Sequence, residues 1–159
     1  MTDDRQERSK VEVSNDLAYE IRLHERHARL YRRVRATLAF IALCGGASAF
    51  ANLFAQPAWL SGIGGVLIAS CAFLDVVFDY SGKAVAHDSF RRKALALQAR
   101  ASALSFEQMD AALSTLSQED PGSIESLRRP AFHDMLRTRG YPEYVDRLNL
   151  RERIADLIA

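Results

Sequence analysis

The amino-acid sequence predicts an all-α fold: a two-transmembrane helical hairpin with long juxtamembrane helices and a small helical cytoplasmic C-terminal region. The first observation is that the 39 residues 36–74 contain no Asp, Glu, Lys, Arg or His. The second is that apolar residues on both sides of this stretch recur at steps of three and four, the period of a helix. The third is that no segment alternates apolar and polar residues as a half-buried strand does.

The N-terminal part is expected to form one long helix. Residues 1–13 are polar and mixed in charge, so we expect a flexible N-terminus there. Residues 14–35 follow as a cytoplasmic amphipathic helix. One face of this helix carries residues at steps of three and four: Leu17, Ile21, His24, Ala28 and Tyr31. Because no Gly or Pro interrupts residues 11–44, the helix can continue into the apolar stretch.

The predicted transmembrane hairpin covers residues 36–80. A spanning helix needs about 20 apolar residues, so the stretch divides into a first span at 36–55 and a second span at 59–80. Pro57 stands at the division and ends the first helix. Since the link is so short, the two spans are expected to be antiparallel neighbours.

The distribution of basic residues predicts the orientation of the hairpin. Residues 21–35 contain six arginines and one acid, and residues 81–100 are also rich in Lys and Arg, whereas the link between the spans is uncharged. The positive-inside rule then places both termini in the cytoplasm. The same basic residues are expected to attract anionic lipid headgroups. The net charge of +1 gives no general attraction to nucleic acid, and we expect no nucleic-acid partner.

Residues 81–159 are expected to form a cytoplasmic helical region. A helix over 81–104 has the apolar rhythm of the helix at 14–35, so the two are expected to pack as a stalk. Ser105 and Gln108 fit a capping box that opens a short helix. A further helix is expected from Pro121, with a kink or a break near Arg129 caused by Pro130, and a stop at Gly140. One or two short helices then close the chain.

Small residues in the two spans are expected to be helix-packing positions, because close approach of backbones drives association in lipid. These positions are Gly45, Gly46, Ala49, Ser61, Gly65 and Ala69. Two interpretations remain open. The small residues join the two spans of one chain, or one face of them joins neighbouring chains in a homo-oligomer.

Polar residues at the cytoplasmic end of the spans are the candidate site. Asp75 and Asp79 are four residues apart and share a helix face, with Asp75 about one turn inside the membrane. Arg32 and Arg35 stand at the same level at the start of the first span. Three interpretations remain open. Asp75 pairs with Arg35 or Asp79 with Arg32 as a boundary ion pair, or Asp75 lines a cation pathway together with Asn52. The third is that the carboxylates serve a proton relay or are simply exposed at the interface.

The sequence predicts no enzyme. No phosphate-binding glycine loop follows a strand, and no Ser or Cys has the setting of a nucleophile. His24 and His27 are three residues apart and either share a metal ion or have a solvated or interhelical role, and the second interpretation is favoured. We therefore expect no cofactor and no metal site.

Two segments carry a resemblance to a known family. "LHERHARLYRRVRATLAF" at 23–40 and "LDVVFDYSGKAVAHDSFRRKALAL" at 74–97 resemble the SLATT families, two-transmembrane proteins associated with bacterial nucleotide-signalling modules. The most specific part is the pattern D-x-V-x-x-Y-S-x-K-A-x-x-H at 75–87. The resemblance implies a bacterial or phage-encoded protein of the inner (plasma) membrane, a pore-forming effector of conflict or antiphage defence systems, and a cytoplasmic sensor or regulatory partner.

Three functional hypotheses follow. The first is a homo-oligomeric pore-forming effector of SLATT type. The second is a non-conducting membrane scaffold whose cytoplasmic helices recruit a partner protein. The third is a soluble helical protein that buries its apolar hairpin in an oligomer, and 39 consecutive uncharged residues argue against it.

Overall fold

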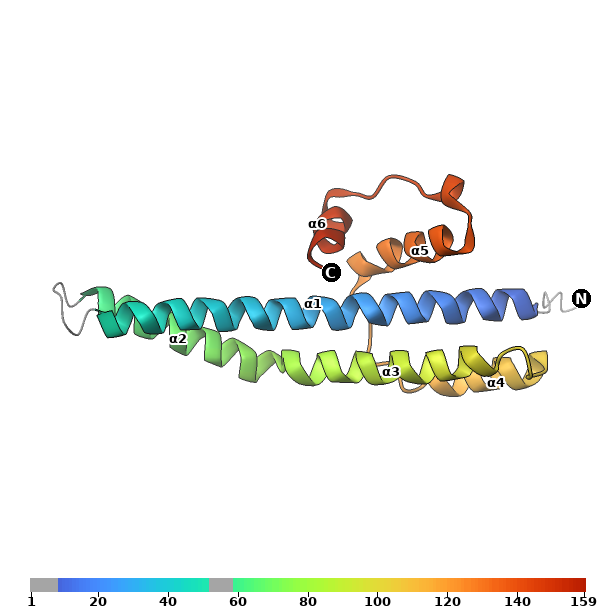
Figure 1. Cartoon of the computed structure of the whole chain (residues 1–159), viewed down its shortest axis with the longest axis horizontal. Coiled ribbons are helices and arrows are strands. Elements are labelled where there is room, and N and C mark those ends of the chain that lie inside the picture. The colour runs from blue at the N-terminus through green and yellow to red at the C-terminus, as the bar shows by residue number, and fades with distance from the viewer. Residues whose placement is uncertain (1–8, 52–58) are drawn as a thin grey trace, which may run out of the picture. The chain divides into compact units, whose positions relative to one another are not determined.

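The computed structural model confirms the all-α class. It describes residues 9–51 and 59–159, and the side chains of 9–47 and 62–159. The elements in chain order are α1 (Lys10–Ala51), α2 (Trp59–Phe78), α3 (Tyr80–Arg100), α4 (Phe106–Ser117), α5 (Glu125–Arg139), the short 3-10 helix η1 (Pro142–Tyr144) and α6 (Leu150–Ile158). The described residues form no strand. Figure 1 shows α1 as one uninterrupted helix.

The chain divides into two compact units, which we describe separately. The terminal unit comprises residues 1–28 and 86–159, and the hairpin unit comprises residues 29–85. Both α1 and α3 belong to the two units in part, since each helix crosses a boundary between them.

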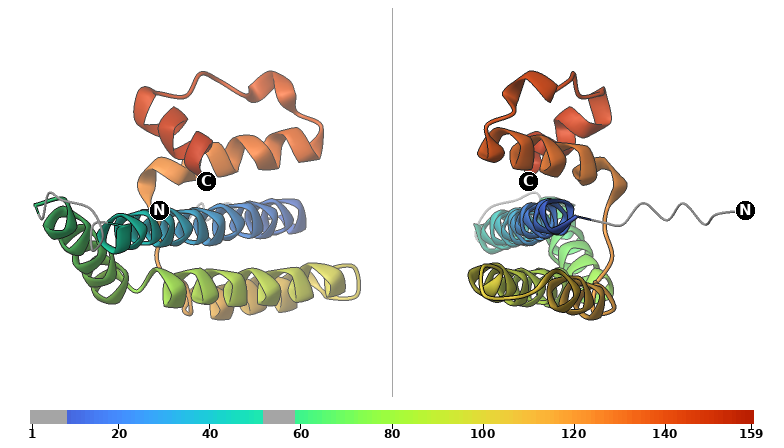
Figure 2. Two further views of the ribbon diagram at one scale, coloured as in Figure 1. Left: turned by 60° about the vertical axis from the view of Figure 1, so that its left-hand side comes forward. Right: turned by 90° about the vertical axis from the view of Figure 1, so that its right-hand side faces the viewer.

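The terminal unit has a core of three helices. Within it α3 and α4 lie side by side, and both views of Figure 2 show this arrangement. The buried apolar residues come in threes from α1, α3 and α4: Val13, Leu17, Ile21, Phe90, Ala94, Leu97, Met109, Leu113 and Leu116. The expected packing of the helix at 14–35 against the helix at 81–104 is therefore confirmed for the part within this unit. α6 packs on α5.

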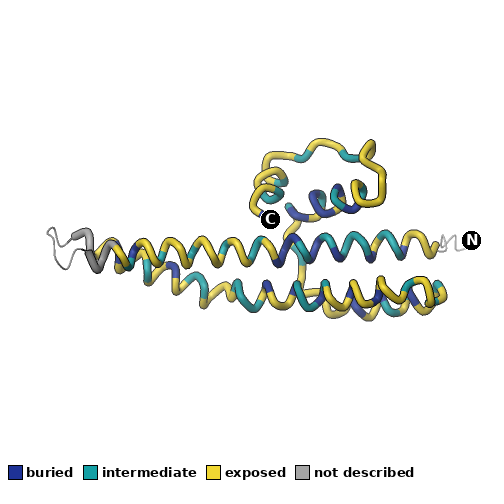
Figure 3. The backbone as a smooth tube through the Cα atoms, in the orientation of Figure 1, coloured by how far each residue is buried: buried dark blue, intermediate teal, exposed yellow. Residues whose placement is uncertain are grey.

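The hairpin unit exposes most of its apolar side chains. Figure 3 shows mainly exposed residues along α2, in contrast to the buried stripe in the first half of α1. The helical stretch Gly62–Arg100 contains an 18-residue window of mean hydropathy 1.8, and only 11% of this window is buried. Because α3 carries Lys83, Asp88 and Arg91, the apolar part of this stretch lies in α2.

Among the described residues this is one candidate membrane span, where the sequence predicted two. Residues 36–51 of the first expected span form the end of α1, which runs to Ala51. Residues 52–55 lie outside the described residues. The described apolar run is thus shorter than the roughly 20 residues that a span requires.

Asp79 separates α2 from α3, where the sequence predicted continuation of the helix through Tyr80. Its φ of 44° is left-handed, which is uncommon for a residue other than Gly. The Asp79 Oδ1 atom accepts a hydrogen bond from the backbone N–H of Gly82 at 2.9 Å. Asp79 therefore caps the N-terminus of α3, and the carboxylate fills the space that a side chain at Gly82 would need.

In the C-terminal region the helix caps are where the sequence predicts them, but one helix begins later than predicted. The capping box of Ser105 and Gln108 is present, and Gly140 ends α5 with a φ of 85°. The helix expected from Pro121 begins only at Glu125, because residues 118–124 form an irregular link in which Asp120 accepts a hydrogen bond from the Gly122 N–H. Pro130 lies inside α5, which continues through it rather than breaking.

Candidate functional site

Two glycines lie at the closest approach of α1 and α2 in the hairpin unit. A Cβ placed on Gly45 would lie 3.1 Å from the carbonyl oxygen of Gly64, so the two backbones approach closely at this point. Gly46 faces Ile68 at a distance of ordinary contact. By contrast, a Cβ on Gly62 or Gly65 would meet no atom of the described residues within 4 Å. The helix-packing role predicted for Gly45 and Gly46 thus falls within one chain, whereas Gly65 faces outward.

The other predicted packing positions are Ala69, Ala49 and Ser61. Ala69 is exposed on α2, on the outward face with Gly62 and Gly65. The side chains of Ala49 and Ser61 lie outside the described residues. The outward face of α2 is therefore lined by small residues that have no role inside the hairpin.

Replacing Gly45 by valine is expected to separate α1 from α2, since the added Cβ would press on a backbone carbonyl that cannot rotate away. The hairpin unit should lose about 1–3 kcal/mol of stability, measured as the thermal unfolding of the full chain in detergent micelles. Gly65→Val is the matched control. In detergent at a dilution at which the chain is monomeric, its free energy of unfolding should lie within about 0.5 kcal/mol of that of the unchanged chain, apart from the small cost of a β-branched side chain in a helix. Equal effects of the two substitutions would contradict the assignment of the two faces.

Asp75 and Arg35 meet in the hairpin unit. The Arg35 Nε atom lies 3.7 Å from the Asp75 Oδ2 atom, and the Arg35 Nη1 atom donates a hydrogen bond to Ser81 Oγ at 3.1 Å. The Asp75 Oδ1 atom is buried and has no hydrogen-bond partner within the described part of the chain. Of the two predicted ion pairs, the structure thus brings together Asp75 and Arg35.

The remaining predicted site residues are placed differently. The Asp79 carboxylate bonds the Gly82 N–H as the cap of α3. Arg32 is exposed on α1, one turn before Arg35. Asn52 lies outside the described residues. A pathway lined by Asp75 and Asn52 therefore stays a prediction.

Three buried histidines come together in the terminal unit. His24 and His27 on α1 are fully buried, and His87 on α3 is 2% exposed. The Nδ1 atoms of His24 and His87 are 2.8 Å apart, and the rings of His27 and His87 stack with centroids 4.6 Å apart. Within the residues that the structure describes, no three His, Cys, Asp or Glu side chains have the geometry to hold a metal ion. The histidine cluster, as we call these three residues, lies between helices.

The surroundings of His27 fix its protonation. Its Nδ1 atom lies 2.8 Å from the carbonyl oxygen of Leu23, which only accepts, so Nδ1 carries the hydrogen. Its Nε2 atom accepts a hydrogen bond from the backbone N–H of Ile124 at 2.7 Å. A proton on Nε2 would remove that bond, so His27 is held neutral.

Burial lowers the pKa of two members of the cluster. Desolvation lowers the pKa of His27, and the nearby His24 lowers it further. Desolvation, and then the neighbouring His27 and His24, lower the pKa of His87 from 6.5 to about 4. Both rings therefore remain neutral in the folded chain under conditions in which an unfolded chain binds protons at them.

The terminal unit is accordingly expected to lose stability as the pH falls. Above pH 6.5 neither state binds a proton at these rings, and stability is greatest. Between about 6.5 and about 4 the unfolded chain binds more protons at His87, so the folding equilibrium constant should fall by up to about tenfold per pH unit for each neutral histidine. Urea unfolding at a series of pH values measures this slope. His87→Phe should flatten it, and an unchanged slope would contradict the account.

Arg26 joins three helices of the terminal unit. It is 8% exposed, and its guanidinium lies 2.6 Å from Asp134 on α5 and 2.6 Å from Asp156 on α6. Sequence inspection missed this residue because it counted all juxtamembrane arginines toward topology. The available signal was its position two residues after His24, because a helix that is buried over a broad face also buries residues beside its apolar stripe.

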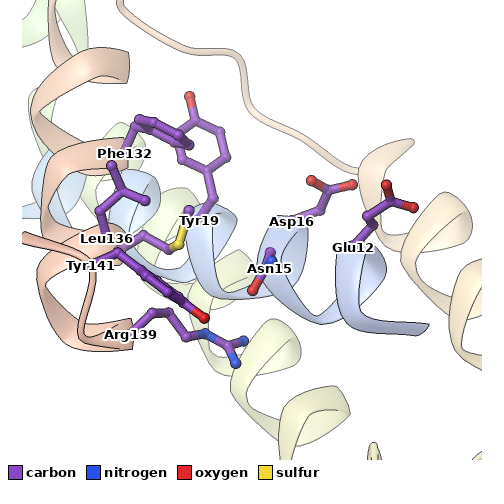
Figure 4. A pocket seen from close by; sticks show the side chains of 9 residues that line it. Glu12, Asn15, Asp16, Tyr19, Phe132, Leu136, Arg139 and Tyr141 are labelled. Atoms are coloured by element: carbon purple, nitrogen blue, oxygen red, sulfur yellow. The ribbon is translucent and has the colours of Figure 1, made fainter. Parts of the chain in front are cut away.

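A cavity of about 470 Å³ lies between α1 and α5 in the terminal unit (Figure 4). It is lined by Glu12, Asn15, Asp16, Tyr19, Phe132, Met135, Leu136, Arg139 and Tyr141. Its volume is in the range of small-molecule sites. Two charged groups of the cavity make hydrogen bonds within the protein. Arg139 donates to Ser14 at 2.8 Å, and Glu12 accepts from the Ser9 N–H.

Among the described side chains, the arrangements closest to a functional site are the ion pair at the boundary of the apolar hairpin and the buried histidine cluster. No catalytic nucleophile with a base was identified among the described side chains. Comparisons of the chain with protein-family models, curated proteins and solved structures give no match.

Proposed function

We propose that this chain is a two-span protein of the bacterial inner membrane that assembles as a homo-oligomeric pore, in the manner of the SLATT effectors that its sequence resembles. The observation that carries the proposal is the exposure of the apolar helix. An 18-residue window of mean hydropathy 1.8 that is only 11% buried supports a helix that faces lipid over the core of a soluble domain. Lipid is the environment that accommodates such a surface.

Exposed side chains on the hairpin unit support a lipid-facing surface. The most exposed are Phe40, Leu43, Val66, Phe73 and Val76, with relative exposures between 65% and 80%. The proposal includes the end of α1 as a second span, since Gly45 brings α1 against α2 along the same apolar stretch. Basic residues before the first span then lie with both termini on the cytoplasmic side, next to anionic headgroups.

Assembly of several copies is required for conduction, because two helices enclose no path. The small residues Gly62, Gly65 and Ala69 on the outward face of α2 allow another helix to approach closely. In this arrangement Asp75 lies near the cytoplasmic mouth with Arg35 as its counter-charge. The terminal unit would receive the regulatory signal from a cytoplasmic sensor.

Ion flux from proteoliposomes that contain the purified full chain tests the proposal. We expect release of a trapped ion that depends steeply on protein density, and a change in cation-over-anion preference in Asp75→Asn. Asp79→Asn is the matched control and should keep the preference, because Asn also caps a helix. Absence of flux at every density from a chain that has inserted would contradict the pore.

A non-conducting scaffold is the second candidate, and the contact between Arg35 and Asp75 favours it. A carboxylate neutralised by an arginine of its own chain serves insertion and needs no ion path. In this case the cytoplasmic helices would recruit a partner protein. The scaffold predicts an inserted oligomer without flux in the same experiment.

A further inference from the structure

The distance between the Nδ1 atoms of His24 and His87 limits the number of protons that the two rings can carry. Their Nδ1 atoms are 2.8 Å apart, so one nitrogen donates a hydrogen and the other offers a lone pair. Hydrogens on both atoms would point at each other. The pair therefore has room for one additional proton and not for two.

The other nitrogen of His24 faces negative charge. His24 Nε2 is buried, makes no hydrogen bond within the described residues, and lies 3.3 Å from Glu20 Oε2 and 3.6 Å from Asp120 Oδ1. A buried polar atom without a hydrogen bond is rare in folded proteins. A positive charge on the His24 ring would turn both contacts into ion pairs.

The full surroundings of His24 come from three elements. On α1 they are Glu20 and His27, on α3 they are His87 and the ring of Phe90, and from the link 118–124 comes Asp120. Phe90, with its ring centroid 3.9 Å from that of His24, keeps water away from one ring face. His27 is fixed as neutral by Leu23 and Ile124.

We propose that His24 and His87 form a site that binds and shares a single proton, with Glu20 and Asp120 as its counter-charges. In the neutral form His24 carries its hydrogen on Nε2, toward the carboxylates, and His87 donates from Nδ1. Uptake of one proton gives His24 a hydrogen on both nitrogens, and His87 then accepts at Nδ1 and carries its own hydrogen on Nε2. No other group has to move.

The proton site is coupled to the link between α4 and α5. Asp120 belongs to this link, and Ile124 at the end of the same link donates to His27. Protonation of His24 strengthens the attraction to Asp120 and so holds the link against α1. The terminal unit thereby contains a response to acidification of its surroundings that is independent of whether the hairpin conducts ions.

Imidazole ¹⁵N NMR of the full chain in detergent micelles, recorded from pH 8 to pH 5, tests the site. We expect the signals of His24 and His87 to change together with uptake of one proton, while His27 keeps its Nδ1–H form. Asp120→Asn should lower the midpoint by about one pH unit, since it removes a facing charge. The matched control Glu143→Gln, on the exposed helix η1, should not shift it.

Several outcomes would overturn the proposal. They are two separate proton uptakes at His24 and His87, no titration of either ring in this range, titration of His27, or an unshifted midpoint in Asp120→Asn. Selective loss of the His24 signal on addition of Zn²⁺ would assign the cluster to metal binding instead. Because Asp120 is partly exposed, its variant is expected to fold even where changes of the buried rings do not.

Discussion

Replacing Arg26 by alanine is expected to detach α5 and α6 from α1 and to lower the free energy of unfolding of the terminal unit by about 2–3 kcal/mol. The guanidinium is almost fully buried and pairs with Asp134 and Asp156 at once. Its removal leaves two carboxylates without their cation. We expect a smaller loss of free energy of unfolding than the roughly 3–5 kcal/mol of fully buried pairs, because both aspartates are partly exposed.

Urea unfolding followed by circular dichroism measures this loss, and limited proteolysis within residues 118–124 reports detachment. Arg22→Ala is the matched control on the same helix, since Arg22 is partly exposed, pairs with Glu25 on α1 and makes only a long hydrogen bond of 3.4 Å to Thr138 on α5. Such surface pairs contribute at most about 1 kcal/mol. If Arg22→Ala and Arg26→Ala destabilised the chain equally, the central role of Arg26 would be wrong.

Replacing Arg35 by alanine is expected to have the second large effect, because it leaves the Asp75 carboxylate in the apolar stretch without the contact at 3.7 Å. A charged residue at the centre of a span costs roughly 2.5–3.5 kcal/mol, and less near the boundary, so we expect a loss of about 1–3 kcal/mol. The fraction of chain that inserts into membranes during synthesis measures it.

The matched variants separate charge from packing. Asp75→Asn alone should insert at least as well as the unchanged chain, and adding it to Arg35→Ala should restore most of the loss. This asymmetry follows because the amide needs no counter-charge. A double variant as impaired as Arg35→Ala alone would show that Arg35 acts through packing or topology rather than through Asp75.

The sequence was a good guide where a local signal determined the structure. The apolar rhythm located the first half of α1 and α3, and Ser105 and Gly140 marked helix ends because caps depend on nearby residues. The sequence predicts a boundary charge at Asp79. Its role as the cap of α3 depends instead on a left-handed backbone and on the N–H of Gly82. Pro121 resembled a helix start, but Asp120 bonds Gly122 and forms a turn instead.

The histidine cluster shows what a single sequence leaves open. His24 and His27 are close in sequence, but His87 is 63 residues away from His24 and meets it only after the hairpin folds back. A signal was present, because His87 precedes Phe90, Ala94 and Leu97 in the rhythm of the buried face. The tautomer of His27 depends on the Ile124 N–H and has no sequence signature.

The central claim is that the apolar hairpin lies in lipid, and labelling of Cys44 tests it most directly. Cys44 is exposed on the hairpin unit, so a soluble chain would present its thiol to water. In a Cys71→Ala chain in membrane vesicles, we expect a charged maleimide to leave Cys44 unlabelled until the bilayer is dissolved in detergent. The control chain carries Cys44→Ser and Ser114→Cys in addition to Cys71→Ala. Its thiol, at an exposed position of α4, should be labelled without detergent in inverted vesicles. Labelling of Cys44 in intact vesicles at the rate of that control would contradict the account.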